Sequence, residues 1–341
     1  MKNKEIAEKL KISPATVSLA LNNRAGVSEE TRRRVIELKN DSLKNDLKSA
    51  YKEETGVEGG EIGFIIYKQT GKIVSETPFF VTLTEVICRY AKKNGYSVEI
   101  IYHTFRDDLE TFIDGINQSN LAGCLIVGTE LDRKTVGKIK ATLKKPFVIL
   151  DAAFPGMDVD SVLMDNRGGI FQAIQHAVSL GHREIGFINC NEQVYNFTER
   201  FESYKYYLNE FGLDYNPEFV YEVPYMSKEI SACLKAQMRL RKELPSAMIA
   251  ANDIIALGAY SAFFDMNLRI PEEISLIGFD NMPTTKYVTP QLTSINLNNH
   301  IIGKNAVCRL IELIQQPHNN TVHIQNIVSV NLVVRDSVSQ K

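Results

Sequence analysis

The 341-residue sequence lacks the features of a membrane protein, of a metalloprotein and of a disulfide-linked scaffold. It has no run of about 18 apolar residues, which a membrane-spanning helix needs. Its five cysteines are scattered and lack metal-ligand spacing, so we expect reduced core thiols and no bound metal. Residues 1–20 carry six Lys and Glu residues, which argues against a signal peptide. We therefore expect a cytoplasmic protein without a membrane partner.

Motifs of the common enzyme classes are also missing. The sequence contains no G-x-G-x-x-G fingerprint, and the Thr70-Gly71-Lys72 triplet lacks the upstream glycine of a phosphate-binding loop. The six histidines are scattered, and His182 in LGHREIGF is typical of a strand entrance rather than of catalysis. We expect that the protein is not an enzyme and uses no cofactor.

Charge is present but unevenly distributed along the chain. Residues 1–52 contain 12 Lys/Arg and 7 Asp/Glu, whereas the formal net charge of the whole chain is -2. The length predicts about two to three domains. A small basic head on an acidic body indicates a head that binds a polyanion.

The basic head has the pattern of three short helices. KEIAEKL places Ile, Ala and Leu on one helical face, and Ser13 followed by Pro14 is a typical start for a second helix. Gly26 suits a loop with positive φ, and Ser28 caps the third helix, EETRRRVIEL. Two helices joined by a tight turn and braced by a third describe a helix-turn-helix, whose second helix enters the DNA major groove.

The second helix carries almost no charge on its outward side, which favours a helix that faces DNA. Its apolar residues can contact thymine methyl groups: Pro14, Ala15 and Leu19. Its polar residues carry short donors that reach phosphates: Thr16, Ser18 and Asn22. The alternative is a three-helix cap that packs on the body, but so uncharged a helix would make a poor solvated face.

The rest of the chain alternates apolar strands and amphipathic helices. The predicted strands are 61–67, 97–103, 123–128, 146–154, 183–190, 246–253 and 274–281. The predicted helices are 80–94, 107–117, 132–144 and 199–211, and the pattern restarts after residue 166. Continuous apolar strands between helices predict parallel sheets covered on both faces. Two such runs predict two doubly wound α/β lobes with a ligand crevice at the strand ends.

Polar residues recur where the apolar strands end. Each alone is commonly a cap or turn residue, but together they predict a ligand site: Asp151, Asn252 and Asp280 at strand ends, and Arg200 near a helix start. Carboxylates accept hydrogen bonds from vicinal hydroxyls, and Arg donates in a planar fork. Aromatic residues can form flat walls for a sugar ring or a base: Phe79, Phe80 and Tyr225.

The head resembles that of the lactose repressor/galactose repressor (LacI/GalR) family of bacterial transcription regulators. The resemblance rests on IAEKLKISPATVSLALNN followed by GVSEETRRRV. It implies that the second helix contacts DNA through Ser13, Pro14, Ala15, Thr16, Ser18, Leu19 and Asn22. It also implies DNA-backbone contacts around the start of the third helix, from Val27, Ser28 and Thr31.

The body is similar to that of the same family, which looks like a periplasmic sugar-binding protein. Its markers are TPFF, VILD, LGHREIGFI, ANDIIALGA, PEEISLIGFDN, PQLTSI and LVVRDS. The resemblance implies an effector pocket that contains Asp151, Arg200, Asn252 and Asp280. Tyr225 and Asn299 are looser matches to the same pocket, and Phe79 of the TPFF marker is a further candidate.

The resemblance also implies the domain organisation. We expect a helix-turn-helix domain at 1–40, a linker at 41–60, and an effector-binding and dimerisation domain at 61–341. Within the last, we expect one lobe from 61–157 and 296–322 and the other from 158–292 and 323–341. The linker departs from the family's hinge because the Pro-Asn and Ala-Arg pairs are missing, which leaves Leu43 and Leu47 as candidate minor-groove wedges.

The function implied is a DNA-binding transcriptional regulator, specifically a repressor that acts as a homodimer on a palindromic operator. A small ligand between the lobes, a sugar or sugar derivative, would control its DNA affinity. The alternatives are a solute-binding protein for transport, an enzyme of the doubly wound class, and a regulator whose effector is a purine or a phosphoprotein. The basic head opposes the first, and the lack of catalytic motifs opposes the second.

Overall fold

The computed structural model describes residues 3–21, 26–28, 30–35, 59–76, 79–225, 227–316 and 322–341. The chain divides into two compact units. One comprises Met1–Gly60 with Asn94–Tyr96, and the other comprises Glu61–Lys93 with Ser97–Lys341. The linker prediction for 41–60, including both wedge candidates, falls almost wholly outside the described residues.

The head contains the two helices predicted from its sequence, α1 (Asn3–Leu10) and α2 (Pro14–Leu21). Lys11 turns the chain between them with a φ of 54°. Ser13 caps α2 as predicted, because its Oγ accepts a hydrogen bond from the Thr16 backbone N–H at 3.1 Å. Gly26 has the expected positive φ, at 102°. Residues 30–35 form part of the predicted third helix.

A small apolar core holds these helices together. The buried members come from all three helical segments: Ile6, Ala7, Val17, Ala20 and Val35. The guanidinium of Arg32 also donates to the carbonyl of Ala20 at 3.1 Å, which ties the third segment to the end of α2. The outward side of α2 is therefore left uncovered within the described part of the head.

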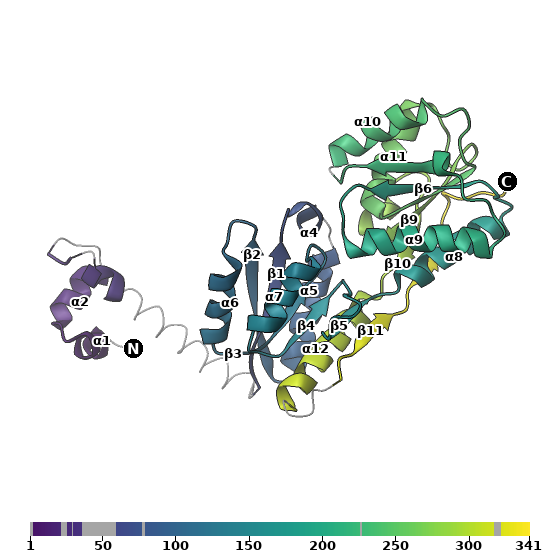
Figure 1. The fold of residues 1–341 in the computed structure, drawn as a ribbon. Coiled ribbons are helices and arrows are strands. Elements are labelled where there is room, and N and C mark those ends of the chain that lie inside the picture. Colours follow the sequence, from purple (N-terminus) through teal and green to yellow (C-terminus); the bar gives the residue numbers. More distant parts are fainter. Residues whose placement is uncertain are drawn as a thin grey trace. The chain divides into compact units, whose positions relative to one another are not determined.

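The first lobe of the body is a six-stranded sheet in the order β11-β5-β4-β3-β1-β2 (Figure 1). Its strands are β1 (Gly60–Lys68), β2 (Tyr96–Thr104), β3 (Leu121–Val127), β4 (Phe147–Leu150), β5 (Ser161–Met164) and β11 (Gln325–Val328). Its helices are α4 (Lys72–Glu76), α5 (Phe79–Lys93), α6 (Leu109–Gln118), α7 (Arg133–Thr142) and α12 (Asn299–Gln315). The pairings of β1 with β3, β3 with β4, β4 with β5, and β5 with β11 are parallel.

The second lobe is another six-stranded sheet, in the order β12-β10-β9-β8-β6-β7. Its strands are β6 (Ile185–Cys190), β7 (Val220–Val223), β8 (Ala247–Ala250), β9 (Ser275–Asp280), β10 (Thr293–Asn296) and β12 (Asn331–Val333). Its helices are α8 (Asn166–Ser179), α9 (Tyr195–Glu210), α10 (Ser227–Met238) and α11 (Asp253–Asp265), with short 3-10 turns η1 (Pro217–Phe219) and η2 (Pro283–Lys286). Only β12 runs antiparallel to its neighbour among the pairings described.

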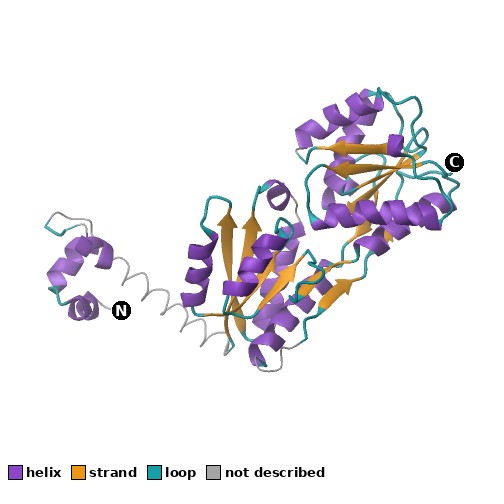
Figure 2. Cartoon of the chain, viewed as in Figure 1, coloured by secondary structure: helices purple, strands orange, loops and turns teal. Residues whose placement is uncertain are grey.

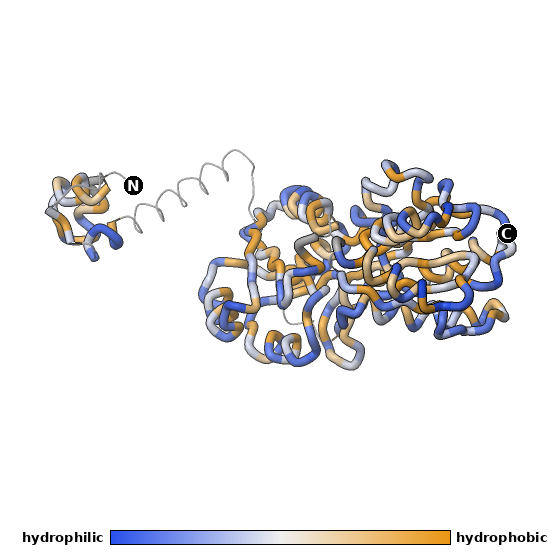
Figure 3. The backbone as a smooth tube through the Cα atoms, turned by 90° about the horizontal axis from the view of Figure 1, so that it is seen from above, coloured by the Kyte–Doolittle hydropathy of each residue, from blue (hydrophilic) through white to orange (hydrophobic). Residues whose placement is uncertain are grey.

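Both sheets are covered by helices, as the alternating sequence pattern predicts (Figure 2). Hydrophobic residues are concentrated inside the body, and hydrophilic residues follow its outer turns (Figure 3). The central strands β3, β4, β6, β8 and β9 are buried along almost their whole length. The doubly wound α/β fold of both lobes is thus confirmed.

The chain crosses between the lobes at places that differ from the predicted boundaries. β5 pairs with β4 in the first sheet, although the sequence assigned residues 158–292 to the second lobe. β11 also belongs to the first sheet, although residues 323–341 were assigned to the second. The difference has a simple cause: β5 and β11 have only four residues each, and so short a strand has no feature that specifies which sheet it joins.

Candidate functional site

The exposed side of α2 carries the residues that the sequence assigned to DNA. Ser13, Pro14, Ala15 and Ser18 are exposed, whereas Thr16 and Leu19 are half-buried. The hydroxyls of Ser13 and Thr16 lie 2.9 Å apart. At the next helix start, the Ser28 Oγ accepts a hydrogen bond from the Thr31 N–H at 3.2 Å, and Val27 packs against the head core. Asn22 lies outside the described residues.

A pocket in the body is lined by residues from both lobes. Both carboxylates follow strands, Asp151 after β4 and Asp280 at the end of β9. Each has a positive φ, 66° and 106° respectively, so the backbone turns sharply where these side chains enter the pocket. The full lining is Ile73, Phe79, Phe80, Thr129, Asp151, Met164, Val194, Asn196, Phe197, Arg200, Asn252, Asp280 and Leu297. The structure thus brings together five of the seven predicted pocket residues.

Arg200 is the buried cation of the pocket. Its Nε donates to Asn166 Oδ1 at 2.8 Å, its Nη1 to the carbonyl of Ala251 at 2.7 Å, and its Nη2 lies 3.5 Å from Asp280 Oδ1. The guanidinium carbon also lies 3.7 Å from the centre of the Phe279 ring. These hydrogen bonds use three of the five N–H donors of the guanidinium, so it retains donors for a bound molecule.

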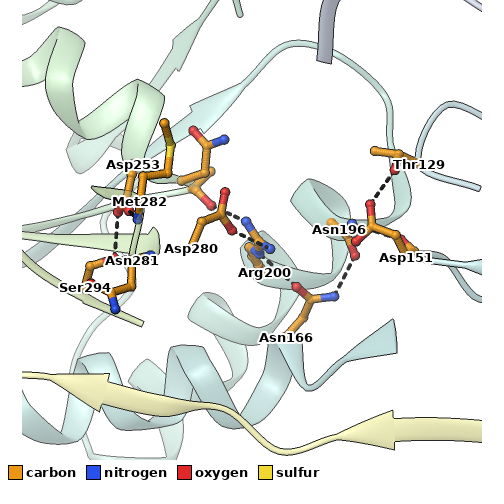
Figure 4. A network of polar contacts seen from close by, with 12 residues as sticks. Thr129, Asp151, Asn166, Asn196, Arg200, Asp253, Asp280, Asn281, Met282 and Ser294 are labelled. Atoms are coloured by element: carbon orange, nitrogen blue, oxygen red, sulfur yellow. Dashed lines mark hydrogen bonds and ion pairs between the residues drawn. The ribbon is translucent and has the colours of Figure 1, made fainter. Parts of the chain in front are cut away.

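Two asparagines extend this network to the first lobe (Figure 4). Asn166 Nδ2 donates to Asn196 Oδ1 at 2.8 Å, and Asn196 Nδ2 donates to the carbonyl oxygen of Asp151 at 2.9 Å. The hydroxyl of Thr129 then donates to the Asp151 carboxylate. A continuous chain of hydrogen bonds therefore joins Arg200 in the second lobe to Asp151 in the first.

Burial controls the protonation of the two pocket carboxyls. It raises the pKa of Asp151 to about 6, although Thr129 and Arg200 act to lower it. It raises the pKa of Asp280 to about 6 as well, against the lowering effect of Arg200 and Asn252. Near neutral pH both carboxyls are therefore mostly ionised and able to accept hydrogen bonds, whereas mild acid protonates them.

Two predicted pocket residues do not line the pocket. Tyr225 lies behind it, where its hydroxyl accepts a hydrogen bond from Asn252 Nδ2 at 3.1 Å. Tyr225 therefore supports a lining residue rather than forming a wall. Asn299 lies in the first turn of α12, beyond the lining residue Leu297. Asn299 is therefore not among the residues that line the pocket.

Several lining residues were not predicted, although two carry a recognisable signal. Asn196 precedes Arg200 by four residues on α9, and this spacing places both side chains on one face of a helix. Thr129 follows β3, as Asp151 follows β4. Phe197 forms an aromatic wall, and its ring lies 5.8 Å from that of Tyr225. Among the described residues, no cluster of His, Cys, Asp and Glu could hold a metal ion.

Comparison with known proteins agrees with these observations. Residues 3–40 match the family of bacterial regulatory proteins of the lacI type, and residues 174–338 match the periplasmic binding protein-like domain. The repressor PurR of Mannheimia succiniciproducens is 26% identical over 340 residues, which is 99% of this chain and 98% of the relative. The ribose operon repressor of Haemophilus influenzae is 27% identical over 338 residues and covers 98% of each chain.

The chain therefore combines a LacI-family helix-turn-helix domain with a periplasmic binding protein-like domain.

A solved structure shares this combination of domains in its fold. The structure of the lac repressor dimer bound to operator and the anti-inducer ONPF has a TM-score of 0.72 to this chain, with 23% identity and 98% of each chain covered. The two relatives described above are transcriptional repressors, which are not enzymes. No helix in the described ranges is long and apolar enough to span a membrane.

Proposed function

We propose that the protein is a homodimeric cytoplasmic repressor that binds a palindromic operator through α2. A neutral, hydroxyl-rich molecule held between the lobes, a sugar or sugar derivative, would control its affinity for DNA. The observation that carries this ligand class is the combination of two buried carboxylates, one arginine and aromatic walls in a single pocket. Carboxylates accept hydrogen bonds from hydroxyls, and flat aromatic side chains pack against the apolar face of a sugar ring.

The charge of the pocket argues against an anionic effector. With both carboxyls ionised, Asp151 and Asp280 outnumber the single cation, Arg200. A phosphate group would therefore meet net negative charge in a site that water does not screen well. A neutral ligand avoids this repulsion.

A purine is the second candidate effector. The Phe79 and Phe80 rings lie 5.0 Å apart at an interplanar angle of 80°, and Phe197 adds a third aromatic side chain to the lining. Aromatic side chains stack on bases as readily as on sugars, and carboxylates accept hydrogen bonds from ring N–H groups. The similarity to the PurR repressor keeps this alternative open.

Thermal unfolding of the full chain in the presence of chosen probes separates these ligand classes. We expect stabilisation by a neutral sugar such as D-ribose and none by ribose 5-phosphate, because a ligand stabilises the state that binds it. Stabilisation by hypoxanthine alone would favour the purine reading. Stabilisation by ribose 5-phosphate alone would contradict the argument from charge.

The DNA-binding proposal rests on the uncharged outward side of α2. A carboxylate at Leu19 would lie against base edges and phosphates, so Leu19→Glu should weaken specific binding by about 1–3 kcal/mol or more. Leu19→Met is the matched control because it keeps an apolar side chain of similar volume. Gel-shift titrations at fixed salt, on an operator selected from random DNA by the parent protein, measure the effect. Equal affinities for Leu19→Glu and the parent would refute the assignment.

The homodimer proposal is supported by large apolar side chains that lie exposed on the second lobe. Phe264 on α11 is 82% exposed, and Tyr287 after η2 is 86% exposed. Aromatic residues are enriched in protein–protein interfaces. A dimer also doubles the contacts on a palindrome, because one helix-turn-helix reads only a few base pairs. Sedimentation equilibrium should show a dimer that Tyr287→Glu shifts toward monomer.

A further inference from the structure

A carboxylate outside the pocket lining holds the segment that follows β1. Glu130 is 7% exposed and lies just beyond Thr129 after β3. Its Oε2 accepts hydrogen bonds from the backbone N–H groups of Thr70 at 2.7 Å and Gly71 at 2.8 Å. Its Oε1 accepts from those of Ile73 and Val74, both at 3.2 Å. Four backbone donors on one carboxylate fix residues 70–74, the rim segment, to the first lobe.

The rim segment also reaches the second lobe. The ammonium of Lys72, the first residue of α4, lies 2.6 Å from Glu192 Oε1. Glu192 lies in the loop between β6 and α9, which also carries the pocket residue Val194 and leads to Asn196 in the first turn of α9. The neighbour of Lys72, Ile73, lines the pocket itself. One short segment therefore contacts the pocket, its own lobe and the opposite lobe.

This ion pair differs from the deeper connection between the lobes. The hydrogen bond from Asn196 to the Asp151 carbonyl is buried and belongs to the pocket network. The Lys72 side chain is 46% exposed and that of Glu192 is 21% exposed, so their ion pair lies at the edge of the pocket and in contact with water. An ion pair in this position can break first, whereas separation of the lobes must also break the buried hydrogen bond.

We propose that the Lys72–Glu192 ion pair is a latch that sets how often the lobes separate and thereby controls access to the pocket. Glu130 acts as a positioning residue, because it holds the rim segment from which Lys72 reaches across. The pocket's role as the effector site rests on the proposed function, whereas the latch is a property of the empty protein. A ligand that displaces Ile73 would move Lys72 with it, which would couple occupancy of the pocket to separation of the lobes.

The distance between the lobes provides the test. Fluorophores are attached through non-natural amino acids at two exposed positions, Ala141 on α7 and Asn209 on α9, in the full chain without any added small molecule. Single-molecule energy transfer then measures the fraction of separated lobes. Lys72→Gln and Glu192→Gln should each raise that fraction by about two- to fivefold, the range expected for a partly exposed ion pair.

Three further measurements decide the outcome. The reversed pair Lys72→Glu with Glu192→Lys should restore the parent distribution. Lys205→Gln, which breaks an ion pair of the same 2.6 Å length inside α9, should leave the distribution unchanged. Glu130→Gln should raise the fraction of separated lobes and speed amide hydrogen exchange within residues 70–74. The latch is refuted if the single variants match the parent, if the reversed pair stays as open as they are, or if Lys205→Gln opens the lobes equally.

Because these measurements need no effector, they remain informative if the ligand proposal fails. A chain with an intact latch but no binding of D-ribose or hypoxanthine would leave the latch standing and remove those effectors. If the chain binds a probe but Lys72→Gln does not change the fraction of separated lobes, the effector proposal stands and the latch is refuted.

Discussion

The two lobes bring different chemistry to the same pocket. The second lobe contributes a connected polar set in which Arg200, Asn252 and Asp280 are each held by other protein groups. The first lobe contributes mainly apolar surface from Ile73, Phe79, Phe80 and Met164, with Asp151 and Thr129 as its polar pair. The difference predicts that most hydrogen bonds to a bound molecule would come from the second lobe, whereas aromatic surface comes from both lobes, including Phe197 of the second.

The same contrast exists between two buried histidines. In the second lobe, His182 Nδ1 lies 2.8 Å from Ser246 Oγ, and its Nε2 lies 3.0 Å from the carbonyl of Ser339. In the first lobe, His103 stacks on Tyr67 with 4.9 Å between ring centres and meets Phe112 edge-on. Neither ring nitrogen of His103 has a hydrogen-bond partner among the residues described. The buried histidine of the second lobe thus bonds to two other segments of the chain, whereas that of the first lobe has only ring contacts among the residues described.

The largest effect should come from the cation of the second lobe. Arg200→Ala leaves Asp280 buried without its charge partner and removes donors to the ligand, so effector binding should weaken by about 2–5 kcal/mol. Arg167→Ala is the matched control, because Arg167 lies near the start of α8 with an exposed side chain. Calorimetry with the effector found by thermal unfolding measures both. Equal binding by Arg200→Ala and the parent would locate the effector elsewhere.

The apolar wall of the first lobe should have a smaller effect. Phe79→Ala removes buried aromatic surface from the ligand, which corresponds to at most about 1.5–3 kcal/mol of affinity. Val81→Ala on the same helix is the control, since Val81 is 75% exposed. The same calorimetric titration applies. A loss for Phe79→Ala larger than that for Arg200→Ala would reverse the proposed division between the lobes.

The two histidines permit a direct comparison of the lobe cores. His182→Phe should lower the free energy of unfolding by about 1–3 kcal/mol, because it leaves buried partners unsatisfied. His103→Phe should leave that free energy unchanged or raise it, because no described partner is lost. Urea unfolding at pH 7.5 measures both variants. The opposite order of stability would show that His103 is bonded through water.

The histidines also predict a pH dependence of stability. Burial lowers the pKa of both His103 and His182, so their folded forms favour the neutral ring. Their contribution to stability is therefore complete above the ordinary value of 6.5 and is lost as the pH falls below it. In His103→Phe this acid sensitivity should be weaker than in the parent.

The pocket carboxyls predict the smallest change, in the pH dependence of binding. Asp151 and Asp280 accept hydrogen bonds from hydroxyls when ionised, and their pKa is raised to about 6 by burial. For each carboxylate that must be ionised to bind it, affinity for a neutral sugar should therefore fall about tenfold between pH 7 and pH 5. The empty protein should respond in the opposite sense: their contribution to its stability is complete below 3.8 and is lost as the pH rises through about 6. Affinity that is constant from pH 5 to 7 would exclude direct contact with these carboxylates.

The long elements could be predicted from sequence because their patterns are strong. Helical spacing in the head predicted α1 and α2, and apolar runs predicted central strands such as β3 and β9. The short strands β5 and β12 were not predicted, whereas the four-residue strands β4 and β8 were. Pairing with distant strands stabilises β5 and β12, and a strand of three or four residues shows little periodicity of its own.

Pocket residues could be predicted where a polar residue type coincides with the end of an apolar strand. Acidic and amide residues at strand ends identified Asp151, Asn252 and Asp280 because the strand ends of such sheets meet ligands. The hydrogen bond between Asn166 and Asn196 was not predicted, because the two residues lie 30 positions apart and only the folded structure brings them together. The positioning role of Glu130 likewise depends on a turn some 60 residues earlier in the chain.

The strand order of the first sheet has a consequence for how the protein is made. β11 borders β5 on one edge of that sheet, and α12 packs against α5, yet both come from beyond residue 298. A ribosome therefore releases most of the first lobe well before it has synthesised that lobe's last strand and helix. During this interval the nascent first lobe lacks its edge strand β11 and its covering helix α12. A messenger truncated shortly before codon 299 would therefore leave the first lobe incomplete as well as the second.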